Sequence, residues 1–360
     1  MLFAGRAACF ALSFPPMFRS KIFTAWFFGA LLAWVCLFAA FNDFAFLANH
    51  WHYPSIMVLG AFVAGLTPEG GGAVAFPVLS VFFNIDRVLA RDFSLMIQSI
   101  GMTSASIFIL TRADQRVATY KPMLWFIPAG FAGFVLGMLT LQTIPAYLIQ
   151  ALFLSLITTF AIAYCFSSHR GTRSSLSAPR IADRAMIFGV LILGGMCASL
   201  FGTGADIILY TLLVTRFGME EKTATHMSIM QMAALSVLGY AYRHFHDGGL
   251  TNYQVRTWLC AYPVVLFMAP FGVYILQKLN VEWMLRGIVL LNIGQLAYFN
   301  INKPSLEKSL ASAVFCAVLM AVFSLTLARL ARRKREADAL QTQPNATSLE
   351  SVPASQQSTP

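Results

Sequence analysis

The feature that most constrains this chain is a glycine-rich break at residues 65–72, which carries the carboxylate of Glu69 and lies between two apolar runs. The runs cover residues 54–66 and 73–83. In a bilayer an interrupted helix leaves backbone N–H and C=O groups without partners, so it is tolerated only where protein or a water-filled cavity covers it. The break therefore predicts a buried passage for a solute.

A second break, Gly202-Thr-Gly-Ala-Asp206, interrupts another apolar stretch at residues 185–215. Shifting one break onto the other by 134 residues aligns them without a gap, and the match continues at a shift of 135 through the following spans. The matched pairs are Gly70 with Gly204, Phe76 with Tyr210, Leu79 with Leu213, Phe83 with Phe217, Ala90 with Ala224, Ser94 with Ser228, Pro128 with Pro263 and Gly137 with Gly272. Each half is thus a broken segment followed by three spans.

The composition is that of a polytopic membrane protein. Hydrophobic residues make up 58% of the chain and charged residues 11%, whereas soluble domains have about half apolar and about a quarter charged residues. A helix of about 20 apolar residues crosses a hydrocarbon core of about 30 Å. Such runs lie at residues 22–41, 92–110, 123–142, 144–166, 225–242, 257–276, 282–299 and 309–329. We therefore expect an all-α integral membrane protein with about eight transmembrane helices and two further re-entrant or broken helices.

The net charge of +10 indicates membrane topology and not nucleic-acid binding. The basic residues lie in short loops and beside the apolar runs, where they orient a membrane protein. The run from Arg329 to Arg335 fits an anionic leaflet, so membrane lipid is the expected partner. The six cysteines lack paired spacing, so we expect neither a disulfide framework nor a metal site, and no cofactor.

The same basic loops decide the direction of the two halves. If each broken segment crossed the membrane, the basic loops at residues 112–121 and 170–184 would lie outside, against the positive-inside rule. If each segment dips in and returns on the same side, these loops lie inside together with both basic termini. Six basic residues then lie outside: Arg87, Arg91, Arg243, Arg256, Lys303 and Lys308. Three crossings separate the equivalent glycines, so we expect inverted repeats, an arrangement of many secondary transporters.

This topology predicts a multi-pass protein of the cytoplasmic membrane with both termini in the cytoplasm, and leaves a homo-oligomer open. The predicted organisation is an N-terminal segment with the first span (1–53), repeat A (54–166), a basic cytoplasmic linker (167–184), repeat B (185–300), a last span with a basic end (301–335) and a disordered tail (336–360).

Two motifs together carry a family resemblance. The stretch Gly65-Leu-Thr-Pro-Glu-Gly-Gly-Gly-Ala-Val-Ala-Phe-Pro77, its counterpart Gly194-Gly-Met-Cys-Ala-Ser-Leu-Phe-Gly-Thr-Gly204, and an alanine four residues before Ser94 and before Ser228 resemble the TauE/SafE sulfite exporter family of permeases. The similarity covers about residues 54–300. Pro68, Glu69 and the extra terminal spans depart from a simple family pattern. The resemblance implies movement of small sulfur-containing or organic anions, such as sulfite or sulfonates, across the cytoplasmic membrane.

The glycines of the breaks are the first candidate binding residues. A half-helix that begins in such a break presents unpaired N–H groups and a partial positive charge, which attract anions, and glycine lets the backbone approach a ligand closely. The candidates are Gly70, Gly71, Gly72, Gly202, Thr203 and Gly204. The alternative is that these glycines only permit close helix packing.

Polar residues on the following spans complete the predicted substrate site. They are Gln98 and Ser99 after the first break and Ser228 and Gln231 after the second, with Ser94, Thr103, Asn292 and Gln295 as weaker candidates of the same kind. Residues three or four apart on a helix lie on one face. Hydrogen bonding between helices is an equally good explanation for any one of them.

Two carboxylates, Glu69 and Asp206, lie at the breaks. A carboxylate there can cap a helix or complement its dipole, but acids inside membranes often mark ion pathways and proton relays. An ionised carboxylate would repel a substrate anion, and protonation would remove that repulsion. We therefore interpret both as candidate proton-coupling residues.

The leading hypothesis is a secondary transporter of small anions that works by alternating access. A cation or metal permease is the alternative within transport, because the breaks carry net negative charge. A membrane-embedded enzyme has no support from the motifs, and a non-transporting subunit stays open. The paired histidines, His50 with His52 and His244 with His246, are better read as interfacial residues than as metal ligands.

Overall fold

The computed structural model describes residues 16–112, 117–165, 173–176, 180–278, 281–302 and 304–342 of the chain. Within these residues the regular structure is helical. The α-helices are α1 (Lys21–Phe41), α2 (Phe44–Asn49), α3 (His52–Leu66), α4 (Gly72–Pro77), α5 (Arg87–Leu110), α6 (Met123–Thr140), α7 (Ala146–Cys165), α8 (Ile181–Phe201), α9 (Ala205–Thr215), α10 (Glu221–Phe245), α11 (Asn252–Leu276), α12 (Val281–Ile301) and α13 (Leu306–Thr342).

Seven helices in the described part of the chain are long and apolar enough to cross a membrane: α1, α5, α6 with the turn before it, α7, α8, α11 and the first part of α13. This confirms an all-α membrane protein. Helices α10 and α12 coincide with the two other predicted spans and have 25 and 21 residues, but they carry polar residues such as Gln231 and Asn292. Helix α8 is also long enough to cross, although the sequence places it in the second broken segment.

Each broken segment forms a hairpin whose two ends lie together. The first hairpin consists of α3, the break, and α4 with the π-helical segment Val78–Phe82 that continues it. Its ends meet where the ring of His52 stacks on the ring of Phe83, with centroids 4.9 Å apart. In the second hairpin, formed by α8 and α9, Arg216 at the end of α9 pairs with Asp183 at the start of α8 at 2.6 Å. Each broken segment therefore begins and ends on the same side of the molecule.

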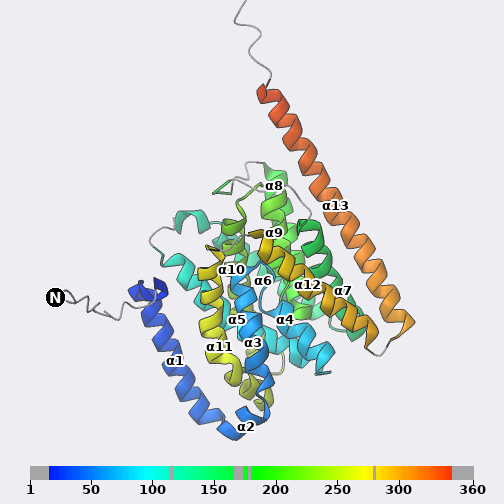
Figure 1. Ribbon diagram of the computed structural model, residues 1–360. Coiled ribbons are helices and arrows are strands. Elements are labelled where there is room, and N and C mark those ends of the chain that lie inside the picture. Colours follow the sequence, from blue (N-terminus) through cyan, green and yellow to red (C-terminus); the bar gives the residue numbers. More distant parts are fainter. Residues whose placement is uncertain are drawn as a thin grey trace, which may run out of the picture.

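The two hairpins open at opposite ends of the molecule, as Figure 1 shows. Helices α5 and α10 lie antiparallel at the centre, because Arg243 near the end of α10 binds Asp92 near the start of α5. Each hairpin leads directly into one of these helices, so one hairpin opens where α5 begins and the other where α10 begins. We name these the α3 end and the α8 end. This is the inverted arrangement that the charge distribution predicts.

Equivalent residues of the two halves make equivalent contacts. Gly272 of α11 packs against Phe62 and Gly65 of α3, and its counterpart Gly137 of α6 packs against Met196 and Ser199 of α8. A Cβ on either glycine would overlap the facing helix. Small residues allow such close approach, which is how membrane helices gain packing energy. These contacts dock each hairpin on a helix of the opposite half.

Helices α1 and α13 lie at the periphery (Figure 1). Only 6% of the apolar window of α13 is buried, and 17% of that of α1, so these helices present apolar side chains to lipid. Helix α13 continues to Thr342, beyond residue 335, where the sequence suggests the start of a disordered tail. Helix α8 begins at Ile181, within the predicted linker, and residues 343–360 lie outside the described residues.

Candidate functional site

The first break is a tight turn between α3 and α4. Helix α3 ends at Leu66, and the Thr67 hydroxyl accepts a hydrogen bond from the Glu69 N–H at 3.2 Å. Gly70 has a φ of 70°, a left-handed conformation that glycine adopts without steric cost. Every residue from Gly60 to Ala61 and from Val63 to Pro77 is buried, so protein covers the interrupted backbone, as a membrane requires.

The second break is held by its own carboxylate. Gly202 and Gly204 have φ values of 73° and 103°, and α9 begins directly afterwards. Oxygen Oδ1 of Asp206 accepts hydrogen bonds from the N–H groups of Gly204 and Ile207, both at 3.0 Å. Asp206, in the first turn of α9, therefore occupies two of the N–H groups at the start of this helix, and these two groups are not open to a ligand in this conformation.

The two breaks meet inside the protein. A Cβ on Gly72 would lie 2.6 Å from Cβ of Thr203, and a Cβ on Gly70 would overlap Oδ2 of Asp206. The Thr203 hydroxyl also lies 3.4 Å from the carbonyl oxygen of Glu69. Glu69 and Thr203 are 134 residues apart and occupy equivalent positions in the two halves. This contact therefore joins one half to the other at matching positions.

Gln98 of α5 joins the second break to the centre. Its side-chain amide donates to the carbonyl oxygen of Gly202 at 2.7 Å and to that of Ser94 at 3.0 Å. Its oxygen Oε1 lies 3.4 Å from the Thr203 hydroxyl. Of the predicted residues on the following spans, Gln98 and the weaker candidate Asn292 have side chains that hydrogen-bond to a break.

The carboxylate of Glu69 points toward α12. Its oxygen Oε1 accepts a hydrogen bond from the Asn292 amide at 2.9 Å, and Asn292 also donates to the carbonyl oxygen of Ile157 in α7. The second oxygen, Oε2, accepts no hydrogen bond from the described residues. Asn292 and Thr158, another pair 134 residues apart, bind each other as well, through the Thr158 hydroxyl at 3.2 Å.

Three predicted residues bind elsewhere. The hydroxyl of Ser99 donates to the carbonyl oxygen of Met96, and that of Ser228 to Thr225, each within its own helix. Gln231 donates to the carbonyl oxygen of Phe126 in α6 at 3.1 Å. Residues on one face of a helix need not reach the same neighbour, and these three make no hydrogen bond to a break.

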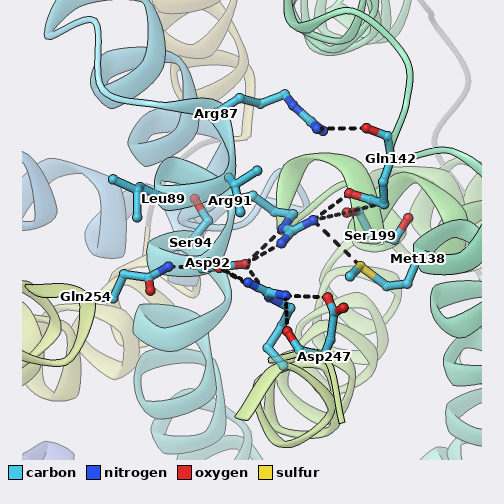
Figure 2. Close-up of polar contacts among 12 residues, drawn as sticks. Arg87, Leu89, Arg91, Asp92, Ser94, Met138, Gln142, Ser199, Asp247 and Gln254 are labelled. Carbon is cyan, nitrogen blue, oxygen red and sulfur yellow. Dashed lines mark hydrogen bonds and ion pairs between the residues drawn. The ribbon is translucent and has the colours of Figure 1, made fainter. Parts of the chain in front are cut away.

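A buried charged cluster lies beside the second break. It comprises Arg91, Asp92, Gln142, Arg243 and Gln254, and we call it the Asp92 cluster. Figure 2 labels all of these residues except Arg243. Arg91 and Asp92 are each 1% exposed, although the sequence suggests an outside loop position for Arg91. A Cβ on Gly202 would overlap the carbonyl oxygen of Arg91. The successive opposite charges within an apolar span are the sequence feature that could have revealed this cluster.

The carboxylate of Asp92 is surrounded by donors from three helices. Arg91 binds it at 2.8 Å, Arg243 at 2.9 Å and the Gln254 amide at 2.8 Å. Arg91 also donates to Oε1 of Gln142 at 2.6 Å. The cluster thereby ties α5, α10 and α11 to the loop after α6, between the α3 end and the meeting point of the breaks.

The equivalent place in the other half holds a different pair. His226 lies 134 residues after Asp92, and Tyr120 lies 134 residues before Gln254. The Tyr120 hydroxyl and Nδ1 of His226 are 3.1 Å apart. The Asp92 cluster near the α3 end thus corresponds to a tyrosine and histidine pair near the α8 end.

Two grooves among the described residues lie away from the breaks. A groove of about 400 Å³ separates α6 from α8, and one of about 640 Å³ lies between α5, α6 and α10. Neither is lined by a residue of either break. Among the described residues, no group of three or more His, Cys, Asp or Glu side chains could hold a metal ion.

Most of the chain matches a known protein family. A family model described as sulfite exporter TauE/SafE matches residues 53–299, which contain both hairpins and the helices between them. The chain belongs to this family. TauE/SafE proteins are membrane permeases, which fits the long apolar helices and the lipid-facing surface. Searches of curated proteins and of solved structures give no match.

Proposed function

We propose that this TauE/SafE protein is a secondary transporter of small anions, such as sulfite, sulfonates or related organic anions, in the cytoplasmic membrane. The observation that carries the proposal is the contact of the two breaks, with Thr203 against Gly72 and Asp206 against Gly70. Hairpins that enter from opposite ends and meet in the interior are typical of alternating access. The basic loops favour cytoplasmic termini.

The amide end of α4 is the better candidate for contact with an anion. The helix that begins at Gly72 continues through Phe82, and the first N–H groups of a helix have no partner within it. In α9 the corresponding groups of Gly204 and Ile207 are occupied by Asp206. Gly70, Gly71 and Gly72 therefore form the proposed anion contact, and Gln98, Gly202, Thr203 and Gly204 form its opposite wall.

A Gly72→Ala variant tests this contact. Its Cβ would lie 2.6 Å from Cβ of Thr203, closer than real Cβ contacts, so the breaks must separate. We expect loss of labelled sulfite transport in proteoliposomes. The control is Gly189→Ala in α8, where a Cβ meets nothing within 4 Å and transport should stay at the level of the parent protein. Transport by Gly72→Ala at the parental rate would refute this location of the path.

Glu69 and Asp206 are the proposed proton-coupling residues. Both are buried, at 1% and 0% exposure, so an ionised form of either is costly without compensation and repels an anion at the same place. A proton that travels with the anion removes both penalties. We expect Glu69→Gln or Asp206→Asn to abolish the dependence of sulfite transport on a pH gradient. An unchanged pH profile in both variants would exclude proton coupling through these residues.

A cation permease is the second candidate function, favoured by the oxygen atoms that gather beside Gly70. The two candidates differ in the solute that exchanges across the membrane. Counterflow of labelled sulfite against unlabelled sulfite, thiosulfate, sulfonates and carboxylates supports the anion transporter. Counterflow of a cation in the absence of every anion in this panel supports the cation permease.

A further inference from the structure

Three side-chain oxygens from separate parts of the fold face one point beside Gly70. They belong to Gln98 of α5, Thr203 of the second break and Asp206 of α9. A Cβ on Gly70 would lie 2.8 Å from Oε1 of Gln98, 2.8 Å from Oγ1 of Thr203 and still closer to Oδ2 of Asp206. The absence of a side chain at Gly70 thus leaves these oxygens around a common centre, which we call the oxygen cluster.

The oxygen cluster is fully buried. The exposed fractions are 2% for Gln98 and 0% for both Thr203 and Asp206. Asp206 belongs to none of the ion pairs found among the described residues. A carboxylate without a compensating charge is strongly unfavourable at such a place.

The cluster has more hydrogen-bond acceptors than donors. The amide nitrogen of Gln98 donates to the carbonyl oxygens of Ser94 and Gly202, which turns its oxygen toward Gly70. Oxygen Oδ2 of Asp206 accepts no hydrogen bond from the described residues. The hydroxyl of Thr203 is the one donor of the group, and it lies 3.4 Å from both Gln98 Oε1 and the carbonyl oxygen of Glu69.

We propose that the oxygen cluster binds Na⁺ as the coupling ion of transport. Carboxylate, amide and hydroxyl oxygens are ligands of hard cations. A cation supplies the positive charge that Asp206 lacks and satisfies several acceptors at once. An anion is not suited to the centre of these three oxygens, because the nearest side-chain atoms there carry negative charge or lone pairs; the proposed anion contact uses the backbone N–H groups of Gly70, Gly71 and Gly72 instead.

The number of ligands selects the type of cation. Ca²⁺ takes six to eight oxygens and Mg²⁺ requires octahedral coordination, whereas the cluster offers three side-chain oxygens, with the carbonyl oxygen of Glu69 adjacent. One carboxylate oxygen balances a single positive charge. A proton on Asp206 would satisfy only one acceptor, whereas the three oxygens converge from different elements, which favours an ion.

This inference rests on the proposed anion transport, and at Asp206 it replaces the proposed proton with Na⁺ as the coupling ion. The cluster joins α5 and Gly70 of the first half to Thr203 and Asp206 of the second half. An ion held here therefore bridges the two breaks at the point where the hairpins meet. Binding of Na⁺ would stabilise this closed arrangement, next to the amide end of α4 that receives the anion.

Binding is tested on the purified full chain in detergent, without substrate. The apparent melting temperature is measured against increasing NaCl, with choline chloride keeping the ionic strength constant. A ligand that binds only the folded state raises the melting temperature with concentration. We expect a rise with Na⁺ for the parent protein, no rise for Asp206→Asn, and an increase of about tenfold or more in the half-maximal Na⁺ concentration for Thr203→Val.

Two further variants separate loss of a ligand from loss of structure. Thr203→Ser retains the hydroxyl and should keep the Na⁺ response, so it shows that the Val variant acts through the oxygen atom. Thr211→Val makes the same change on α9, where the hydroxyl binds the carbonyl oxygen of Ile207, and should respond like the parent. Equal responses of all variants to Na⁺, or none in the parent, would overturn the site.

Transport distinguishes failure of this inference from failure of the proposed function. Labelled sulfite flux is measured in proteoliposomes with a Na⁺ gradient, a pH gradient or neither. Flux driven by Na⁺, and lost in Thr203→Val, supports the site. Flux that responds to the pH gradient alone refutes Na⁺ coupling and leaves the anion transporter standing, whereas absence of any anion flux refutes the proposed function itself.

Discussion

Substitution of Asp92 by asparagine is the sharpest test of the electrostatics inside this fold. The change keeps the shape of the side chain but removes its charge and replaces one acceptor oxygen with an amide that donates. In the structure both carboxylate oxygens accept, from Arg91, Arg243 and Gln254. The asparagine amide would face guanidinium donors, and the buried Arg91 and the partly buried Arg243 would lose their common counterion.

The burial of the charged partners determines how much unfolding free energy the Asp92→Asn variant should lose. Side-chain exposure is 0% for Asp92, 2% for Arg91 and 12% for Arg243, so water cannot replace the lost charge. Removing one member of a buried ion pair typically costs about 3–5 kcal/mol. Part of the charge of Arg243 remains balanced by Asp247, so we expect the lower half of that range.

The assay is reversible unfolding of the purified protein in mixed micelles, with the free energy of unfolding measured by titration with a denaturing detergent. The matched control is Asp43→Asn. Asp43 binds Arg256 at 2.6 Å, but its side chain is 60% exposed, so water and salt replace the lost interaction and no measurable change is expected. If Asp92→Asn is as stable as Asp43→Asn, the Asp92 cluster does not stabilise the closed packing of α5, α10 and α11.

Two further predictions follow from the breaks and from the inverted hairpins. Gly70→Ala should destabilise the protein by clearly more than Gly218→Ala, because both positions have positive φ but only Gly70 is crowded; the left-handed backbone alone costs about 1–2 kcal/mol, and equal unfolding free energies would contradict the crowding. In vesicles of one orientation, an impermeant thiol reagent should label Phe83→Cys and Arg216→Cys from opposite sides, since these residues end hairpins that open at opposite ends; labelling of both from one side would contradict the inversion.

The sequence predicts the repeat, the hairpins and their inversion because these depend on features that local residues carry. Glycine clusters with a carboxylate interrupt apolar runs, and basic loops choose the side of the membrane. The match of Gly137 with Gly272 even anticipates a contact, because both glycines pack on equivalent positions of the opposite half.

The partners of individual polar residues are less predictable. Helical spacing places Ser228 and Gln231 on one face, but the spacing does not say which helix lies opposite, and Gln231 binds α6. Counting charges places Arg91 on the outer side of the membrane but does not predict that its side chain is buried, which depends on its contacts with Asp92 and Gln142. The hydrogen bonds of Asp206 to the N–H groups of Gly204 and Ile207 depend on the turn geometry of Gly202 and Gly204, which the sequence allows but does not specify.

The unequal pairs at matching positions have a consequence for the working cycle. Two identical halves that exchanged roles would spend equal time in either orientation when no gradient is applied. Here Asp92 binds two arginines near one end, and Tyr120 and His226 form a pair at the matching place near the other end. In the proposed alternating-access cycle the two orientations would therefore differ in free energy, and these side chains would set a preferred resting direction.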